Sequence, residues 1–271
     1  MRLLFVGDVL GRPGRDVLTE ALPWLKRQLK TDFVVVNGEN AAHGAGITEQ
    51  ICNGILEAGA DVVTGGNHSW DQREALSFIE RQPRLLRPHN FPAGTPGRGA
   101  AVFESAGRRK VLVLNAMGRL FMDPLDDPFA CIDRELSRHR LGYTVSAVIL
   151  DFHAEATSEK MAMGHYVDGR VSLCVGTHTH VPTSDTMILD RGTGYQTDAG
   201  MTGTYNSVIG MEPSTPIHRF TKKLPGARLS PAEGEGTLCG TYVETDDRTG
   251  RATRIEPVRV GGRLSRHVPA I

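Results

Sequence analysis

Five short apolar segments of this chain are each followed directly by a cluster of carboxylate, carboxamide or imidazole residues. The apolar segments are residues 3–6, 33–36, 61–64, 145–151 and 171–175, and the polar clusters end at Asp8, Asn40, His68, Glu155 and His180. Ligands of an open α/β sheet bind in the crevice beyond the carboxyl ends of its strands. The sequence therefore predicts an α/β fold whose strand ends converge on one polar site.

Apolar residues recur alternately at strand and helix spacing through the first 64 residues. The predicted strands are 3–6, 33–36 and 61–64, and the predicted helices run from Pro13 to residue 29 and over residues 48–58. Pro23 interrupts the first helical pattern and predicts a kink or a new helix start at that point. Thr48 stands where a side-chain hydroxyl would cap the second helix.

From residue 100 the pattern continues with turn signals between the segments. We predict strands at 101–104, 110–114, 145–151, 171–175 and 187–190, and helices at 128–140 and 156–163. Two more strands, near 240–244 and 253–260, are expected to close a second sheet. The segment 221–236 is rich in Lys, Pro and Gly, which predicts a mobile surface loop. With no internal repeat or linker, residues 1–271 are expected to form one mixed α/β domain with two packed sheets.

The charge balance argues against binding to polyanions. The 271 residues include 31 basic and 31 acidic side chains, which disfavours nucleic acid or an anionic membrane as a partner. Apolar runs such as residues 147–150 are too short to span a bilayer, and no leader-like segment follows Met1. The four cysteines form no C-x-x-C pair, which excludes a zinc ribbon and disfavours disulfides. We therefore expect a reduced, cytoplasmic protein and leave its oligomeric state open.

Each polar cluster taken alone has an ordinary structural explanation. Asp8 could cap a helix or turn, Asn40 could complete an Asx-turn, and His153 could be a core histidine bonded to a carbonyl group. His178 and His180 are a stronger signal, because alternate residues of an extended segment project to the same side. Burying all of these groups near one another is costly unless metal ions compensate their charge.

The number of donors predicts two metal ions. The side chains that could bind metal are Asp8, Glu39, Asn40, Asn67, His153, His178 and His180. Seven donors are too many for one ion, and Glu39 is the natural bridge because a carboxylate offers an oxygen to each of two ions. A two-metal centre lowers the pKa of a bridging water and stabilises an in-line displacement at phosphorus. Oxygen and nitrogen donors without thiolate favour iron or manganese, with zinc as a further alternative.

The ordered blocks also resemble the signature of the calcineurin-like metallophosphoesterases. The matching blocks are Gly7-Asp8, Gly38-Glu39-Asn40, Gly66-Asn67-His68, Asp151-Phe152-His153 and Gly176-Thr177-His178-Thr179-His180. That superfamily usually has D-x-H in the first block and G-D-x-x-D in the second, whereas this chain has Leu10 and Glu39-Asn40. These departures, with NGENAAHGAGIT at 37–48, DFHAEATSEK at 151–160 and GMTG at 200–203, are similar to the YmdB-like bacterial phosphodiesterases. The resemblance covers about residues 1–210.

This resemblance implies a fold, a metal centre and a reaction. The fold would be a four-layer α/β-β-α sandwich. The reaction would be hydrolysis of small cyclic nucleotides, notably 2′,3′-cyclic AMP, by in-line attack of a hydroxide that bridges a di-iron-type centre. One metal would be held by Asp8, Glu39, Asn40 and His180, and the other by Glu39, Asn67, His153 and His178. His68 would be the proton donor.

Other functions compete with this interpretation. Residues 7–14 are superficially similar to a phosphate-binding glycine loop, although they fit neither G-x-G-x-x-G nor the P-loop ending. An amidohydrolase would place its H-x-H pair early, on a first barrel strand, whereas His178 and His180 come late. A regulatory metal- and nucleotide-binding protein with incidental hydrolysis, or a phosphomonoesterase, stays open as well. Asp71 is expected either to orient His68 or to cap a helix that begins near Trp70.

Overall fold

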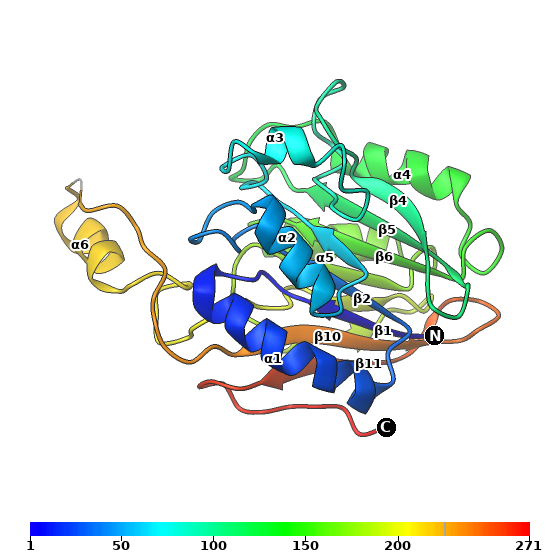
Figure 1. Cartoon of the computed structure of the whole chain (residues 1–271). Coiled ribbons are helices and arrows are strands. Elements are labelled where there is room, and N and C mark those ends of the chain that lie inside the picture. The colour runs from blue at the N-terminus through cyan, green and yellow to red at the C-terminus, as the bar shows by residue number, and fades with distance from the viewer. Residues whose placement is uncertain (225) are drawn as a thin grey trace.

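Two β-sheets packed face to face form the centre of the molecule (Figure 1). The computed structural model describes residues 1–224 and 226–271 of the chain. The first sheet has the order β11 (Ala252–Val260), β10 (Leu238–Thr245), β1 (Arg2–Val6), β2 (Phe33–Asn37), β3 (Val62–Thr64). The second sheet has the order β4 (Ala100–Glu104), β5 (Lys110–Met117), β6 (Ala147–His153), β7 (Leu173–Thr177), β9 (Gly194–Gln196), β8 (Met187–Ile188).

Four layers follow from the alternation of side chains along the strands. In β1, Leu3 and Phe5 pack between the sheets, whereas Leu4 and Val6 pack toward helices. The outer face of the first sheet is covered by α1 (Gly11–Leu29), α2 (Glu49–Glu57) and α3 (Ala75–Phe78). The outer face of the second sheet is covered by α4 (Pro128–Arg138) and α5 (Thr157–Tyr166). The predicted four-layer α/β-β-α sandwich is therefore confirmed.

Helix α1 shows how packing overrides a local helix breaker. Its residues Leu18, Leu22 and Leu25 are buried at helical spacing. The helix runs unbroken through Pro23, so the prediction of a new helix start there is wrong. The buried apolar stripe continues on both sides of the proline, and tertiary packing supplies most of a helix's stability. In α2 the sequence prediction is confirmed, since the Thr48 side chain accepts a hydrogen bond from the Ile51 backbone N–H at 3.2 Å.

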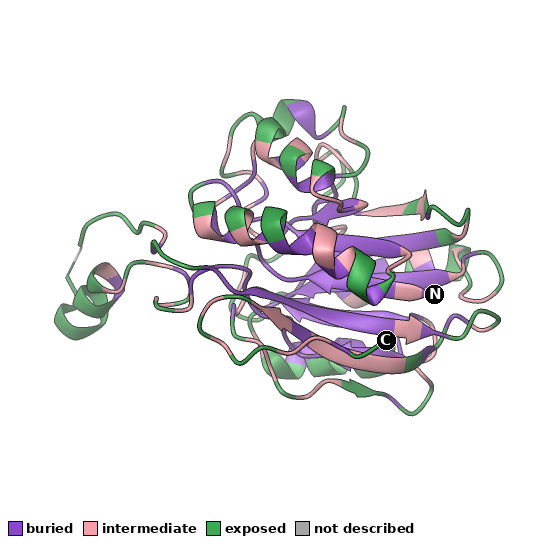
Figure 2. Ribbon diagram, turned by 60° about the horizontal axis from the view of Figure 1, so that its bottom comes forward, coloured by how far each residue is buried: buried purple, intermediate pink, exposed green. Residues whose placement is uncertain are grey.

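The hairpin of β10 and β11 lies in the first sheet and does not close the second, which corrects the sequence prediction. β10 pairs antiparallel with β1, with Val243 opposite Leu3, and β11 pairs with β10. The hairpin thereby covers the edge of β1 that β2 leaves open, which protects that strand from pairing with another chain. The burial pattern shows the outcome: strand interiors are buried, and exposed residues lie mainly on helices and loops (Figure 2).

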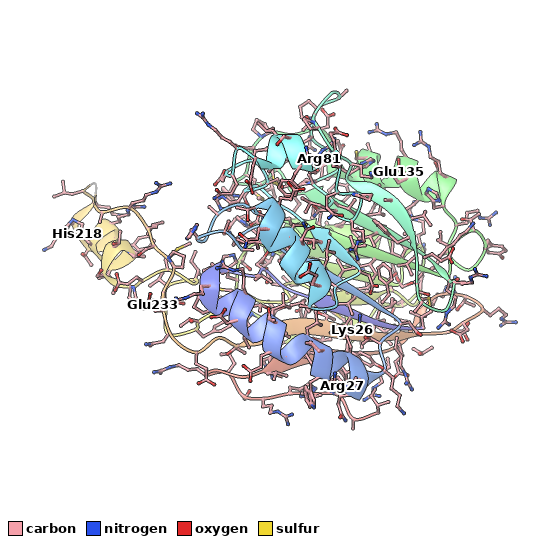
Figure 3. All side chains as sticks on the ribbon, in the orientation of Figure 1. Lys26, Arg27, Arg81, Glu135, His218 and Glu233 are labelled. Carbon is pink, nitrogen blue, oxygen red and sulfur yellow. The ribbon has the colours of Figure 1, made fainter. Side chains whose placement is uncertain are left out.

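Some elements were not predicted from the sequence. These are α3, β9 and α6 (Ser214–Lys222). α6 lies on an arm that leaves the body of the molecule (Figure 1), and its His218 is on the side of the molecule opposite Glu135 of α4 (Figure 3). The predicted loop 221–236 begins within the last turn of α6, and residue 225 of it lies outside the described residues.

Within each sheet the strands that precede the polar clusters are parallel. β1, β2 and β3 run in one direction, as do β5, β6 and β7. The two groups meet at their carboxyl ends, where Asn37 Nδ2 donates to Asp151 Oδ2 at 3.0 Å and Thr64 Oγ1 donates to the same oxygen at 2.6 Å. The predicted convergence of strand ends is therefore confirmed. Across the described ranges, no helix has both the length and the apolar character needed to cross a membrane.

Candidate metal centre

A buried carboxylate and a buried imidazole meet at the edge where the two sheets converge. Glu39 follows β2 and His153 ends β6, and Glu39 Oε1 lies 3.1 Å from His153 Nε2. Asn67, which follows β3, places Oδ1 2.9 Å from the same nitrogen. Glu39, His153 and His178 each offer a ligand atom, and these atoms lie within 4.8 Å of one another. Oxygen and nitrogen donors from both sheets thus form a candidate metal site.

Glycines permit this close approach. At Gly66 an added Cβ would lie 2.1 Å from Glu39 Oε2 and 2.5 Å from His153 Nε2. At Gly176, in β7, an added Cβ would lie 1.8 Å from the Thr197 carbonyl oxygen. No larger residue fits either position without a shift of the surrounding atoms. The glycines that precede the polar clusters therefore allow the backbone to approach the site.

The loop after β7 presents two histidines from left-handed backbone. The φ angles of His178 and His180 are 97° and 66°, so this segment is not extended and the geometric reason expected for their shared orientation is wrong. Such conformations cost about 1–3 kcal/mol each and need external support. The His178 N–H donates to Asp8 Oδ2 at 3.0 Å, and the Met201 N–H donates to the His180 carbonyl at 3.1 Å. His180 Nδ1 lies 2.8 Å from the Ile209 carbonyl oxygen, which leaves Nε2 as its free ligand atom.

Three oxygens of the site have no hydrogen-bond donor. They are Asp8 Oδ1, Glu39 Oε1 and Asn40 Oδ1, half of the six such buried side-chain atoms found in the described part of the chain. The Asn40 side chain is held in place by Nδ2, which donates to the Gly44 carbonyl at 3.1 Å. A buried acceptor without a donor costs about 1–3 kcal/mol. A cation satisfies several acceptors at once, so the residues present fit a metal ion.

Burial and charge shift the pKa values of these groups in different directions. Burial raises the pKa of Asp8. Burial alone would raise the pKa of Glu39, but the nearby charge of His153 brings it down to about 2. Burial alone would lower the pKa of His153, but the neighbouring carboxylate of Glu39 raises it to about 9. Burial, together with the charge of His153, lowers the pKa of His178 to about 3. His178 is therefore a neutral imidazole, the form that binds metals.

A second buried carboxylate orients His153. His153 Nδ1 lies 2.9 Å from Thr177 Oγ1, and that hydroxyl donates to Asp151 Oδ1 at 2.6 Å. This chain of contacts fixes the ring so that Nε2 faces Glu39 and Asn67. Sequence reasoning placed Asp151 in a strand-end cluster without giving it a role. The position of Asp151 in the sequence could have indicated this role. A carboxylate inside an apolar strand is buried and needs hydrogen-bond partners in the protein.

A buried ion pair supports the histidine loop. Lys160 Nζ, on α5, donates to Asp198 Oδ2 at 2.7 Å, and both side chains are almost fully buried. The same carboxylate oxygen accepts from the Thr179 backbone N–H at 3.1 Å and from Thr179 Oγ1 at 2.7 Å. Sequence reasoning missed this pair. A lysine on a helix is normally exposed, and nothing in the pattern marks a distant aspartate as its partner.

His68 lies at the rim of the site. Its Nδ1 is 2.8 Å from Asp71 Oδ2, and its backbone N–H donates to Glu39 Oε2 at 3.1 Å. The side chain is 35% exposed, so it is accessible to a ligand. Asp71 therefore orients His68. The alternative, a helix cap near Trp70, is wrong because the next helix in this region begins at Ala75.

Two of the competing interpretations conflict with the fold. The two packed sheets are not a barrel, which excludes the amidohydrolase architecture. In the glycine-rich segment 7–14, an added Cβ would lie 1.9 Å from the Gly200 carbonyl oxygen at Gly7 and 2.3 Å from the Thr202 carbonyl oxygen at Gly14. These glycines pack against the protein's own backbone, so they do not form a cradle for phosphate.

Comparisons with known proteins agree with this architecture. A family model described as YmdB-like protein matches residues 4–258. A *Bacillus subtilis* relative named 2′,3′-cyclic-nucleotide 2′-phosphodiesterase is 49% identical over 262 residues, 96% of this chain and 97% of its own length. A solved hypothetical protein from *Thermus thermophilus* has a TM-score of 0.90 at 43% identity, covering 97% of this chain and 100% of its own. A solved novel phosphatase from *Mycoplasma pneumoniae* has a TM-score of 0.89 at 33% identity, covering 96% and 93%.

The Lys160–Asp198 pair gives a prediction about stability. Lys160→Met leaves Asp198 as a buried carboxylate without its cation, and we expect the free energy of unfolding to fall by about 3–5 kcal/mol. Adding Asp198→Asn removes the second charge and should restore most of that loss. Urea denaturation of both variants measures the difference, with Lys222→Met on exposed α6 as a control that should change little. Equal losses in the single and double variants would contradict the pairing.

Proposed function

The chain belongs to the YmdB-like protein family, and because of this membership we propose that it is a metal-dependent phosphodiesterase acting on cyclic nucleotides of the 2′,3′ class. The observation that carries the proposal is the set of three unpaired buried oxygens on Asp8, Glu39 and Asn40. They accompany the imidazoles of the site, and the partly exposed His68 donates its backbone N–H to Glu39. The activity in the name of the *B. subtilis* relative supports the choice of substrate.

We infer that the site would hold two metal ions and that Glu39 would be a ligand of both. Asp8, Glu39, Asn40 and His180 would hold one ion, and Glu39, Asn67, His153 and His178 would hold the other. Iron is our first expectation, with manganese or zinc as alternatives, because the donors are oxygen and nitrogen without thiolate. Such ions supply Lewis acidity, which offsets charge on phosphoryl oxygens and makes water nucleophilic at neutral pH.

The protein's own contribution to bond cleavage is a positioned proton donor. Opening a 2′,3′-cyclic phosphate expels a ribose alkoxide, which leaves readily only when it is protonated as the P–O bond breaks. The contact between His68 Nδ1 and Asp71 makes Nε2 the nitrogen that delivers the proton. The bond from the His68 backbone N–H to Glu39 ties this donor to the metal-site carboxylate. His68 therefore acts on the leaving group without binding metal.

A substrate panel tests the function itself. With Mn²⁺ or Fe²⁺ present, we expect the protein to hydrolyse 2′,3′-cyclic AMP. We expect it to hydrolyse aryl phosphodiesters as well. The panel adds 3′,5′-cyclic nucleotides and p-nitrophenyl phosphate, a monoester. Turnover of the monoester alone would identify a phosphomonoesterase. Nucleotide binding without turnover of any diester would favour the regulatory binding protein.

Metal content tests the two-ion site. The purified protein is expected to hold close to two transition-metal ions per chain, measured by elemental analysis. Glu39→Ala should remove both ions, since both would share its carboxylate, whereas Asp8→Ala should mainly weaken one. Glu104→Ala, an exposed carboxylate on β4, serves as the control and should leave the metal content unchanged. Full activity with a single tightly bound ion would refute the two-metal proposal.

His68→Ala separates proton donation from a structural role. We expect the variant to keep its metals but to lose about 10²–10⁴-fold in kcat toward 2′,3′-cyclic AMP. Toward bis(p-nitrophenyl) phosphate the loss should be much smaller, because nitrophenolate departs without a proton. Steady-state kinetics on both substrates, with metal content measured on the same preparation, distinguishes the two roles. Equal damage to both activities would show that His68 only maintains the structure of the site.

A further inference from the structure

Phe121 is exposed to an unusual degree for an aromatic residue. Its side chain is 90% exposed, the highest value among the large apolar side chains of the described residues. Its φ angle is 61°, a left-handed conformation that bulky residues rarely adopt. Backbone strain of this kind clusters at ligand-binding positions, where the surrounding structure maintains it. The exposed ring of Phe121 on a strained backbone is therefore a candidate contact for a ligand.

Phe121 follows the strand next to the one that ends at His153. β5 and β6 are parallel neighbours, and Met117 at the end of β5 is opposite His153 at the end of β6. The Gly118 backbone N–H then donates to the His153 carbonyl at 2.9 Å. Phe121 follows only three residues later, so its Cα lies within roughly 11 Å of Gly118 Cα. The short connection keeps Phe121 at the end of the fold where β6 ends at His153.

The segment that carries Phe121 is held firmly. The backbone N–H groups of Arg119 and Leu120 both donate to the Glu159 carboxylate, at 3.0 to 3.2 Å. Glu159 is buried in the first turn of α5. On the other side, Asn90 accepts from the Met117 backbone N–H and donates to its carbonyl, at 2.9 and 2.8 Å. The backbone that precedes the exposed ring is thus fixed by hydrogen bonds on both sides.

Other aromatic rings of the described residues are already engaged in packing. Trp70 packs edge-on against Phe91 with centroids 5.9 Å apart. Phe129 packs against both Phe152 and Tyr166. Within the residues the structure describes, Phe121 makes no ring–ring contact of this kind, so its π face is open to a ligand.

We propose that Phe121 is the base-stacking residue of the active site and sets its preference for nucleotides over other cyclic phosphates. This inference rests on the proposed phosphodiesterase function. Every nucleobase has a π face, and stacking on an aromatic side chain contributes to binding without a requirement for base-specific hydrogen bonds. Because the backbone of this segment is fixed before binding, only the Phe121 side chain loses conformational freedom when the base arrives. Purines, which have the larger face, are preferred over pyrimidines.

The test compares two substrates with the same five-membered cyclic phosphate, one with a base and one without. They are 2′,3′-cyclic AMP and glycerol 1,2-cyclic phosphate. Phe121→Ala is expected to lower kcat/KM for the nucleotide about tenfold, mainly through KM, and to leave the glycerol compound nearly unchanged. Phe121→Trp should retain the nucleotide activity, whereas Phe121→Leu, apolar but without a π face, should resemble the alanine variant.

An exposed aromatic residue at the amino end of β6, far along the strand from the candidate site, provides a matched control. Tyr143 is 80% exposed and precedes β6 at its amino end, so Tyr143→Ala should change neither activity. Equal losses on both substrates for Phe121→Ala, or no loss on either, would overturn the stacking role. Failure of the unmodified protein on both substrates would instead overturn the phosphodiesterase function, so the two failures are distinguishable.

Discussion

The buried contact between Glu39 and His153 is the constraint on which the rest of the site depends. Two ionisable groups removed from water are costly to desolvate, and their attraction offsets that cost only if the remaining polar atoms are paired. That condition is not met, because Asp8, Glu39 and Asn40 each keep a buried oxygen without a donor. The polypeptide alone thus leaves a local excess of acceptors. A bound cation removes this excess, so the same contacts that weaken the metal-free site favour metal binding.

A site of this kind needs two sheets. The first sheet delivers the carboxylate Glu39 at the end of β2, and the second delivers the imidazole His153 at the end of β6. Asp151 joins the two edges, because it accepts hydrogen bonds from Asn37 and Thr64 of the first sheet and from Thr177 of the second. The inter-sheet core therefore fixes the distance between the carboxylate and imidazole donors. The packing of the two layers thus determines the geometry of the candidate metal site.

The sequence could reveal the convergence but not its details. Parallel strands place their carboxyl ends at one edge whatever their exact boundaries, so the clusters after β1, β2, β3, β6 and β7 could be predicted to meet. The placement of β10 beside β1 could not, since nothing local marks which sheet edge a distant hairpin will cover. The left-handed backbone of His178 depends on the hydrogen bond that its N–H donates to Asp8, a contact made across the fold. Lys160 was likewise inconspicuous, because its burial depends on a partner distant in sequence, Asp198.

The departure of Leu10 from the superfamily pattern bears on which metal the site prefers. Leu10 stands where a histidine is usual, and its buried side chain offers no donor. Asn40 lies next to it in space, since the Asn40 carbonyl accepts from the Gly11 N–H at 3.0 Å. Asn40 also carries one of the unpaired oxygens, so an amide oxygen is available where an imidazole nitrogen is absent. Oxygen is the harder ligand, and in the two-metal centre that we propose this exchange would favour iron or manganese over zinc at that position. In the proposed centre, the departure at Leu10 would therefore act on the choice of metal and not on the Glu39–His153 contact.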